Sequence, residues 1–278
     1  MVTLWQTASI PRVVARVGQD GASDVTLSPG LSFTSGTSQF RGAASLDGAN
    51  YWATGSNQPV QYGSLSSAAV TPVSTGPVSN NRCVNLFGSQ LFISTGFANP
   101  TPGTAKGVYS LPSLLTDSSS GIPINSTVAI DTGDASSPFD FVLFDTNADS
   151  AFDRAYIADD RTAATGGGLL RYDLSGGAWS LTYTLTDGLG GAGLRGLTGL
   201  INAAGQAELW ATTAPAVDGP NALVRITDLG GASAFNTLAT AAPNTIFRGV
   251  DFAPVPAPGA WVVLSSGAAC VLRRRRPH

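Results

Sequence analysis

A short phrase recurs along this chain, and it limits the folds that the chain can adopt. An apolar run that ends in small and polar residues occurs four times, at 51–55, 92–96, 156–160 and 209–213. An arginine followed by a small residue also recurs, as Arg41-Gly42, Arg82-Cys83, Arg195-Gly196 and Arg248-Gly249. Because such repeats bury their apolar faces against one another, the sequence predicts one structural unit used several times.

The spacing of the repeats sets the size of this unit. Arg41 and Arg82 are 41 residues apart, and Arg195 and Arg248 are 53 residues apart. The apolar runs have the same two spacings, with 41 residues between Trp52 and Ile93 and 53 residues between Ile157 and Trp210. Units of about 40–55 residues that hold several short strands have the size of a β-propeller blade.

The third unit shows how many strands a blade would contain. Strands are expected at 139–144, 155–158, 168–174 and 179–185, and the last of these alternates strictly between apolar and polar residues. Polar turns separate the four runs. The sequence therefore predicts an all-β fold, a β-propeller of four-stranded blades over residues 1–253.

Counting the units gives about five blades. Four begin near residues 41, 82, 139 and 195, whereas the strand expected at 246–253 has no partner strands after it. Residues 12–28 contain two further strand-like runs, which are expected to complete the last blade and remove the exposed sheet edges. If the N-terminus is truncated, the ring would be open or strained and the natural protein would have more blades.

The C-terminal segment 254–278 differs in character from the body. Residues 259–272 carry no charge, and four arginines follow them: Arg273, Arg274, Arg275 and Arg276. About 20 residues are needed to cross a bilayer, so this segment is short for a stable membrane helix. A short apolar helix closed by a basic cluster is typical of a cleavable sorting signal; the alternative is a buried terminal helix with a solvated basic tail.

The order of these parts resembles the PEP-CTERM sorting signal of exported proteins from Gram-negative bacteria that make exopolysaccharide. In that family a V-P-E-P motif precedes the apolar segment, and here its place is taken by Val255, Pro256, Ala257 and Pro258, with Ala257 replacing Glu. The resemblance implies export to the cell envelope or the extracellular space and transient anchoring in the membrane by this transmembrane segment. It also implies processing by an exosortase-type protease.

The body resembles uncharacterised secreted bacterial propeller proteins that carry this kind of tail, a likeness that rests on the strand order and on Arg195–Gly199. No activity is established for that group of proteins, so the resemblance implies none for this chain. An exported chain is expected to begin with a basic and then an apolar stretch, and residues 1–10 are too polar and too short for this. We therefore expect that the chain lacks its natural N-terminus.

The inventory of chemical groups excludes several classes of function. His278 is the only histidine, which removes Ser-His-Asp triads and histidine-ligated zinc from the body. Without the four terminal arginines, eleven basic and eighteen acidic residues remain, a formal charge of −7 that argues against nucleic acid as a partner. Cys83 and Cys270 form no disulfide or metal pattern, and Cys83 is expected to act as a small buried side chain.

One loop has the composition of a cation site. Oxygen ligands at alternate positions suit Ca²⁺, and the candidates are Asp145, Asn147, Asp149 and Asp153. The sixth position is Ser150 and the twelfth is Tyr156, so a full EF-hand loop is excluded. The alternatives are a structural calcium ion and a solvated turn rich in Asp and Asn.

The repeated arginines are expected to line the central channel of the propeller. They could bind an anionic ligand there, or they could pair with carboxylates and carbonyls of neighbouring blades. The run Asp159-Asp160-Arg161 ends a strand, and it is either part of the propeller mouth or a turn with a local ion pair.

These observations predict an exported, surface- or matrix-associated propeller that binds exopolysaccharide or envelope proteins and performs no catalysis. Two alternatives remain: a calcium-dependent propeller hydrolase of the lactonase or phytase type, and a truncated fragment without function. Calorimetric or spectroscopic calcium dependence would favour the first alternative or a structural metal, whereas failure to fold would favour the second.

Overall fold

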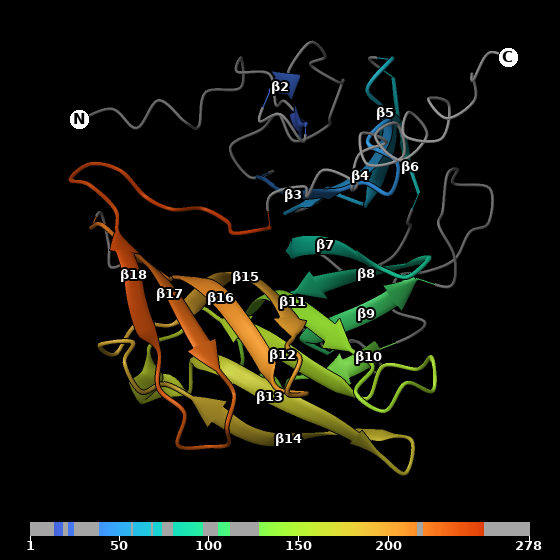
Figure 1. Cartoon of the computed structure of the whole chain (residues 1–278). Coiled ribbons are helices and arrows are strands. Elements are labelled where there is room, and N and C mark those ends of the chain that lie inside the picture. The colour runs from blue at the N-terminus through green and yellow to red at the C-terminus, as the bar shows by residue number, and fades with distance from the viewer. Residues whose placement is uncertain are drawn as a thin grey trace, which may run out of the picture. The chain divides into compact units, whose positions relative to one another are not determined.

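The chain is built almost entirely of β-strands, so the prediction of an all-β fold is confirmed. The computed structural model describes residues 14–18, 22–24, 39–56, 58–67, 69–73, 80–96, 105–111, 128–215 and 219–252 (Figure 1). Within this part of the chain the helical structure is a single 3-10 turn, η3 (Ala163–Thr165). No helix among the described residues is long and apolar enough to span a membrane.

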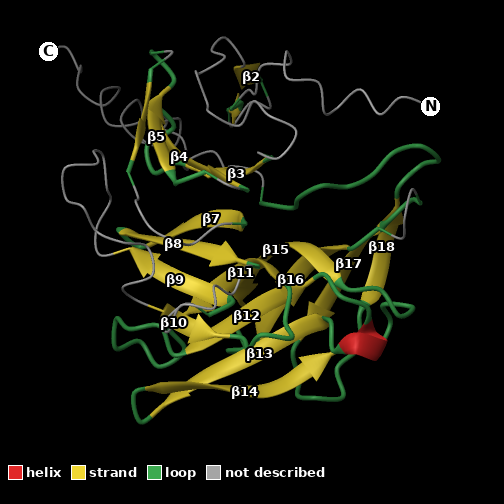
Figure 2. Ribbon diagram, turned by 180° about the vertical axis from the view of Figure 1, so that it is seen from behind, coloured by secondary structure: helices red, strands yellow, loops and turns green. Residues whose placement is uncertain are grey.

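Sixteen of the strands form four four-stranded antiparallel sheets, in which each strand pairs with its neighbour in sequence (Figure 2). The first sheet consists of β3 (Phe40–Ala44), β4 (Asn50–Gly55), β5 (Gln61–Ser64) and β6 (Val70–Pro72). The second consists of β7 (Asn81–Phe87), β8 (Gln90–Thr95), β9 (Gly107–Leu111) and β10 (Val128–Asp131).

The third sheet contains β11 (Pro138–Phe144), β12 (Arg154–Asp159), β13 (Gly168–Ser175) and β14 (Ala178–Leu185). The fourth contains β15 (Leu194–Ile201), β16 (Ala207–Thr213), β17 (Ala222–Thr227) and β18 (Asn236–Thr240). The four strands expected in the third unit are thus confirmed. Each sheet begins one residue before the repeat starts at positions 41, 82, 139 and 195.

Chain contacts divide the molecule into two units, and the larger one, residues 1–14 and 25–251, holds all four sheets. The smaller unit comprises residues 15–24 and 252–278. Its described part is a two-stranded ribbon of β1 (Arg16–Val17) and β2 (Ser23–Asp24), with an exposed ion pair between Arg16 and Asp24.

The prediction of a last strand at 246–253 is wrong for the described residues 246–252, which form no regular strand. The side chain of Asn221 donates a hydrogen bond to the carbonyl of Phe247 (2.9 Å) and accepts one from its amide (2.8 Å). The backbone of Phe247 is therefore satisfied by a side chain and not by a neighbouring strand. The fifth blade predicted from 246–253 and 12–28 is not formed by the described residues, and the predicted C-terminal helix lies outside them.

Consecutive sheets pack face to face, and a hydrophobic core fills each of the three interfaces. Trp52 and Val60 of the first sheet meet Val84 and Ile93 of the second. The second and third sheets share a further core, and so do the third and fourth. The first sheet therefore contacts the second, the second the third, and the third the fourth.

The third sheet is buried on both faces, and alternate residues of its strands enter different cores. On β12, Tyr156 and Ala158 pack toward the fourth sheet, whereas Ala155 and Ile157 pack toward the second. Successive side chains of a strand point to opposite faces, so a strand covered on both sides must be apolar at nearly every position. This explains the unbroken apolar run of β12.

A buried carboxylate links the third and fourth sheets. Asp228, which follows β17, accepts hydrogen bonds from the hydroxyls of Tyr156 and Tyr183 and pairs with Arg171 at 3.0 Å. Burial raises the pKa of Asp228, but the two tyrosine hydrogen bonds and Arg171 lower it more, so the pKa lies below its usual value. The carboxylate is therefore held in its charged form between the sheets.

The double-sided burial of the third sheet makes its central strands sensitive to truncation. We expect Ile157→Ala, at a fully buried position of β12, to lower the free energy of unfolding by about 2–5 kcal/mol because it leaves a cavity. Urea denaturation followed by circular dichroism measures this change. Leu181→Ala on β14, where the side chain is 50% exposed, is the control, and an equal loss for both variants would contradict the packing described above.

Candidate functional site

The first strands of the four sheets lie next to one another. These leading strands are β3, β7, β11 and β15, and each contacts the next along the chain. They belong to the larger unit and bring together residues more than 150 positions apart in sequence. Any site built on them draws side chains from all four sheets.

Each leading strand contains a β-bulge at the position of the sequence repeat. The pairing register shifts between Phe40 and Gly42, Asn81 and Val84, Pro138 and Phe141, and Leu194 and Leu197. The residues inside the four shifts are Arg41, Arg82-Cys83, Phe139-Asp140 and Arg195-Gly196. A bulge redirects side chains and occurs often beside functional sites, so the repeated arginine marks a redirected position.

Hydroxyl groups of the second strands satisfy the backbone of these bulges. Ser94 on β8 accepts a hydrogen bond from the amide of Cys83 (3.1 Å), and Thr212 on β16 accepts one from the amide of Gly196 (2.9 Å). A side chain at Gly196 would collide with Gly249 and with Thr212, which explains the glycine. The hydroxyls that end the recurring apolar runs therefore replace ladder partners that the bulges lack.

Two of the repeated arginines converge on one carboxylate. Arg82 pairs with Asp160 at 3.1 Å and Arg195 pairs with it at 3.3 Å, so Asp160 of the third sheet bridges to the second and fourth sheets. Both guanidinium groups also lie over the ring of Phe139, at 5.2 and 5.4 Å from its centre. We call Arg41, Arg82, Arg195, Asp160 and Phe139 the arginine cluster.

Arg41 interacts electrostatically with the other charged residues of the cluster. Its guanidinium donates hydrogen bonds to the side chains of Asn80 and Gln39 (3.1 Å for Gln39). Burial, together with the charges of Arg82 and Arg195, lowers the pKa of Arg41 to about 10, and the charge of Asp160 opposes this shift. The three cations are therefore close enough to repel one another.

Neighbouring positive charges favour the ionised form of Asp160. Burial raises its pKa, but Arg82 and Arg195 and the hydrogen bond with Ser137 outweigh this, so the pKa lies below the usual value of an aspartate. Asp160 is thus ionised at neutral pH and pairs its single negative charge with two arginines, Arg82 and Arg195.

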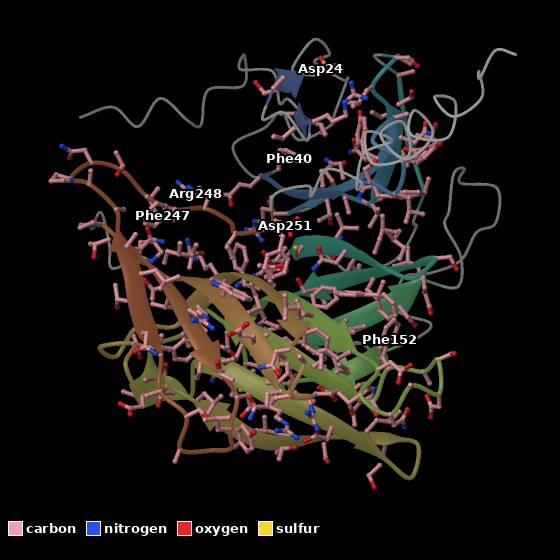
Figure 3. The ribbon with its side chains drawn as sticks, viewed as in Figure 1. Asp24, Phe40, Phe152, Phe247, Arg248 and Asp251 are labelled. Carbon is pink, nitrogen blue, oxygen red and sulfur yellow. The ribbon has the colours of Figure 1, made fainter. Side chains whose placement is uncertain are left out.

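The structure brings together three of the four arginines that the repeat singled out. Arg248 is exposed and lies with Phe247 and Asp251 on the segment after β18 (Figure 3). Phe139 was not singled out, although alignment of the repeats places it where the other sheets carry arginine. In the run 159–161, Asp159 and Arg161 form the expected local ion pair at 2.9 Å, whereas Asp160 points to the cluster.

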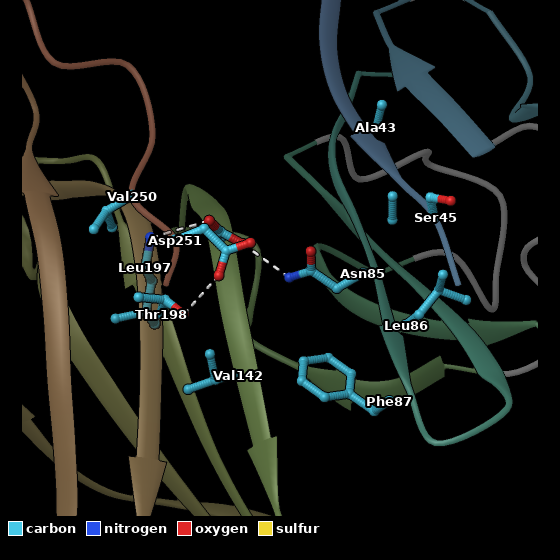
Figure 4. Close-up of a pocket in the computed structure, with 12 residues that line it drawn as sticks. Ala43, Ser45, Asn85, Leu86, Phe87, Val142, Leu197, Thr198, Val250 and Asp251 are labelled. Atoms are coloured by element: carbon cyan, nitrogen blue, oxygen red, sulfur yellow. Dashed lines mark hydrogen bonds between the residues drawn. The ribbon is translucent and has the colours of Figure 1, made fainter. Parts of the chain in front are cut away.

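A pocket of about 350 Å³ lies between the leading strands (Figure 4). All four of them contribute to its wall, together with two residues of the segment after β18. The lining residues are Ala43, Ala44, Ser45, Asn85, Leu86, Phe87, Asp140, Val142, Leu197, Thr198, Val250 and Asp251. The surface that the pocket exposes is mainly polar, with apolar side chains from each leading strand between the polar groups.

Asp140 holds the wall of this pocket together. It accepts hydrogen bonds from the side chain of Asn85 (3.0 Å), the amide of Leu197 (3.0 Å) and the amide of Phe141 (2.8 Å), and so joins three sheets. Burial raises the pKa of Asp140 although these bonds oppose the shift. On the side of the pocket formed by β15 and the segment after β18, Thr198 donates to Asp251 at 3.3 Å (Figure 4).

Cys83 lies in the bulge of β7, partly buried against the core between the second and third sheets. Its thiol approaches Asn85 at 3.7 Å, and burial together with the charge of Asp140 raises its pKa well above the usual value. The group is therefore a neutral thiol at physiological pH, in keeping with a packing role.

The predicted calcium ligands lie in the exposed loop between β11 and β12. The carboxylate of Asp153 accepts bonds from Thr146, that of Asp145 from the amide of Ser150, and that of Asp149 from the amide of Ala151. These are bonds of the turns expected from Asp and Asn. No group of three or more His, Cys, Asp or Glu in the described ranges could hold a metal ion, and calcium binding stays a prediction.

The residues of the predicted sorting motif lie outside the described part of the chain. They are Val255, Pro256, Ala257, Pro258, Arg273, Arg274, Arg275 and Arg276.

No protein-family model and no curated protein matches the chain. Among solved structures it is similar to the extracellular domain of BT4673 from B. thetaiotaomicron, described as a hybrid two-component system, with 12% identity and a TM-score of 0.43 over 80% of this chain. It is also similar to the computationally designed protein Ika8, with 10% identity and a TM-score of 0.41 over 77% of the chain. The chain spans 24% and 65% of the lengths of these two proteins.

The ion pairs of Asp160 predict a pH-dependent contribution to stability. A carboxyl group whose pKa is lowered by folding stabilises the protein above its unfolded pKa of about 4, and this contribution is lost as pH falls through the folded pKa. We therefore expect Asp160→Asn to destabilise the protein most at pH 7, with the difference from the unmodified chain shrinking below about pH 4.

Urea denaturation of both proteins between pH 7 and pH 3 measures this difference. The matched control is Asp134→Asn, which removes the same charge at an exposed turn and is expected to have little effect at any pH. A difference for Asp160→Asn that stays constant across this range would contradict the assigned ion pairs.

Proposed function

We propose that this chain is an exported binding module with a β-propeller architecture, and that its ligand binds in the pocket between the leading strands. The proposed activity is binding without chemical conversion. The partner class is an exopolysaccharide or another component of the cell envelope or matrix.

The arrangement of the sheets supports the propeller. In that architecture four-stranded meander sheets follow one another along the chain, pack face to face, and place their first strands around a common centre. The four sheets here follow in sequence order with a core in each interface, and their leading strands contact one another in the same order.

The observation that carries the proposed function is that one pocket is lined by the leading strands of all four sheets. Its floor is organised by Asp140, which fixes the relative positions of three of those strands. A site held by rigid strands is preorganised, so that binding costs little conformational entropy.

The C-terminal segment supports the proposed export and sorting of the chain. A 14-residue uncharged stretch followed by four arginines suits a signal that pauses in the membrane and is then cleaved. We propose that an exosortase-type protease processes this segment and that the body is then released into the envelope or matrix.

Filling the pocket tests the binding site. Ala43 lines the pocket and is exposed on β3, so Ala43→Trp places a large ring in the cavity without disturbing a core. We expect this variant to lose binding of the full chain to purified bacterial exopolysaccharide by at least about tenfold in biolayer interferometry.

The matched control is Ala239→Trp on the outermost strand β18, where the side chain is also exposed. It should bind like the unmodified chain. If the two variants bind equally well, or if no envelope polysaccharide binds the unmodified chain, the proposed function is wrong.

Replacing the four arginines near the C-terminus tests the proposed sorting signal. With an export signal placed before residue 1 and expression in a Gram-negative host that contains an exosortase, the chain should lose its C-terminal segment. Changing Arg273 to Arg276 together to Ser should prevent this, because the positive stop is gone. Mass spectrometry of the intact protein measures the cleavage, and equal processing of both forms would contradict the sorting signal.

A further inference from the structure

We infer that the arginine cluster binds one oxyanion group of the ligand, a carboxylate, sulfate or phosphate. This inference rests on the proposed function, because it adds an anion subsite to the pocket between the leading strands. The guanidinium groups of Arg41, Arg82 and Arg195 supply the donors, and Phe139 fixes the orientation of two of them.

Positive charge exceeds negative charge in the arginine cluster. Arg82 and Arg195 both pair with the single carboxylate of Asp160, and Arg41 adds a third positive charge that is influenced by the other two arginines. Like charges held this close are unfavourable unless a counter-charge is present. An oxyanion would supply that charge, and arginine is the side chain best suited to bind one.

Arg41 lacks a carboxylate partner among the described residues. Its guanidinium donates hydrogen bonds to neutral oxygens of Asn80, Asn81 and Gln39. Arg82 adds a buried Nε donor that has no acceptor among the described residues. Donors of this kind are costly when buried and unsatisfied, and an incoming oxyanion would accept from them.

The cationic groups of the cluster are preorganised. The guanidinium carbons of Arg82 and Arg195 lie 5.2 and 5.4 Å from the centre of the single Phe139 ring, distances at which cation and ring attract. The bulges fix the backbone from which both arginines extend. The cationic groups are therefore held in place before a ligand arrives, which favours binding.

The arginine cluster neighbours the pocket in sequence, although its residues do not line the pocket. Arg41 lies two residues before Ala43 and Arg195 two residues before Leu197, both of which line the pocket. The side chain of Arg195 is 33% exposed, so the cluster is open to solvent on that side. A ligand that extends from the pocket toward Arg195 would place an acidic group at the cluster.

A purely structural role of the arginines makes a different prediction. Arg82 and Arg195 do hold sheets together through Asp160, but Arg41 takes no part in those ion pairs. If Arg41 were only structural, Arg41→Gln would lower the melting temperature even without added anions. If it belongs to an anion site, the substitution relieves repulsion and leaves that temperature unchanged or higher.

The test is the response of the full chain to sodium sulfate, sodium phosphate and sodium glucuronate, each titrated at constant ionic strength against sodium chloride. We expect at least one anion to raise the melting temperature of the unmodified chain, and Arg41→Gln to weaken its affinity by at least about tenfold in isothermal titration calorimetry. A response to glucuronate alone indicates a uronate carboxylate, whereas a response to sulfate or phosphate indicates a sulfated or phosphorylated group.

The matched control is Arg225→Gln, which removes an arginine that stacks over Trp210 and pairs with Glu208 on the fourth sheet. It should respond to the anions like the unmodified chain. Arg195→Gln is a second test variant. If Arg41→Gln does not fold, the anion affinity of Arg195→Gln tests the inference in its place.

The inference is overturned if no anion acts beyond sodium chloride, or if the cluster variants respond like the unmodified chain. This failure differs from that of the proposed function. Loss of polysaccharide binding in Ala43→Trp, without an anion effect, would leave the binding module standing and remove only the anion site.

Discussion

The packing of neighbouring sheets against one another is the constraint on which the other features depend. In the third sheet, alternate side chains enter the cores on its two sides, as Tyr156 and Ile157 do on β12. This burial fixes how far the leading strands can move apart. Because the apolar faces are used between sheets, the edges of the leading strands remain available to form the pocket.

Two aspartates of the third sheet complement this apolar packing with polar ties. Asp140 bonds to Asn85 of the second sheet and to the amide of Leu197 of the fourth, and Asp160 pairs with Arg82 and Arg195 of the same two sheets. Hydrogen bonds and ion pairs depend on direction, unlike apolar contacts. The ties therefore specify the angle between sheets that the cores alone leave free.

The sequence predicts the fold correctly in those segments whose structure is determined by local patterns. The repeat spacing and the alternation of polar and apolar residues predicted the strands of the third unit, since both reflect burial of one or two faces. The strand expected at 246–253 was wrong because Asn221, 26 residues away, satisfies the backbone of Phe247. No local pattern reveals a bond of that kind.

The candidate site could be predicted from the sequence only in part. Repetition pointed to Arg41, Arg82 and Arg195, but the convergence of two of them on Asp160 and Phe139 depends on the position of the third sheet. Asp140 is the single polar residue of β11 and Asn85 is one of several on β7, and the two acquire their role only when three strands meet. Sequence reasoning could not find them without the register of those strands.

The bulges also separate what the fold requires from what the site requires. A residue inside a bulge carries little of the hydrogen-bonded ladder, so its side chain can change while the strand persists. The third sheet illustrates this, because it has Phe139 and Asp140 where its neighbours have an arginine and a small residue, and yet it forms the same four-stranded meander. Side chains in the bulges can thus diverge from one repeat to the next while the meander persists, and such a change alters the ties between neighbouring sheets rather than the strands themselves.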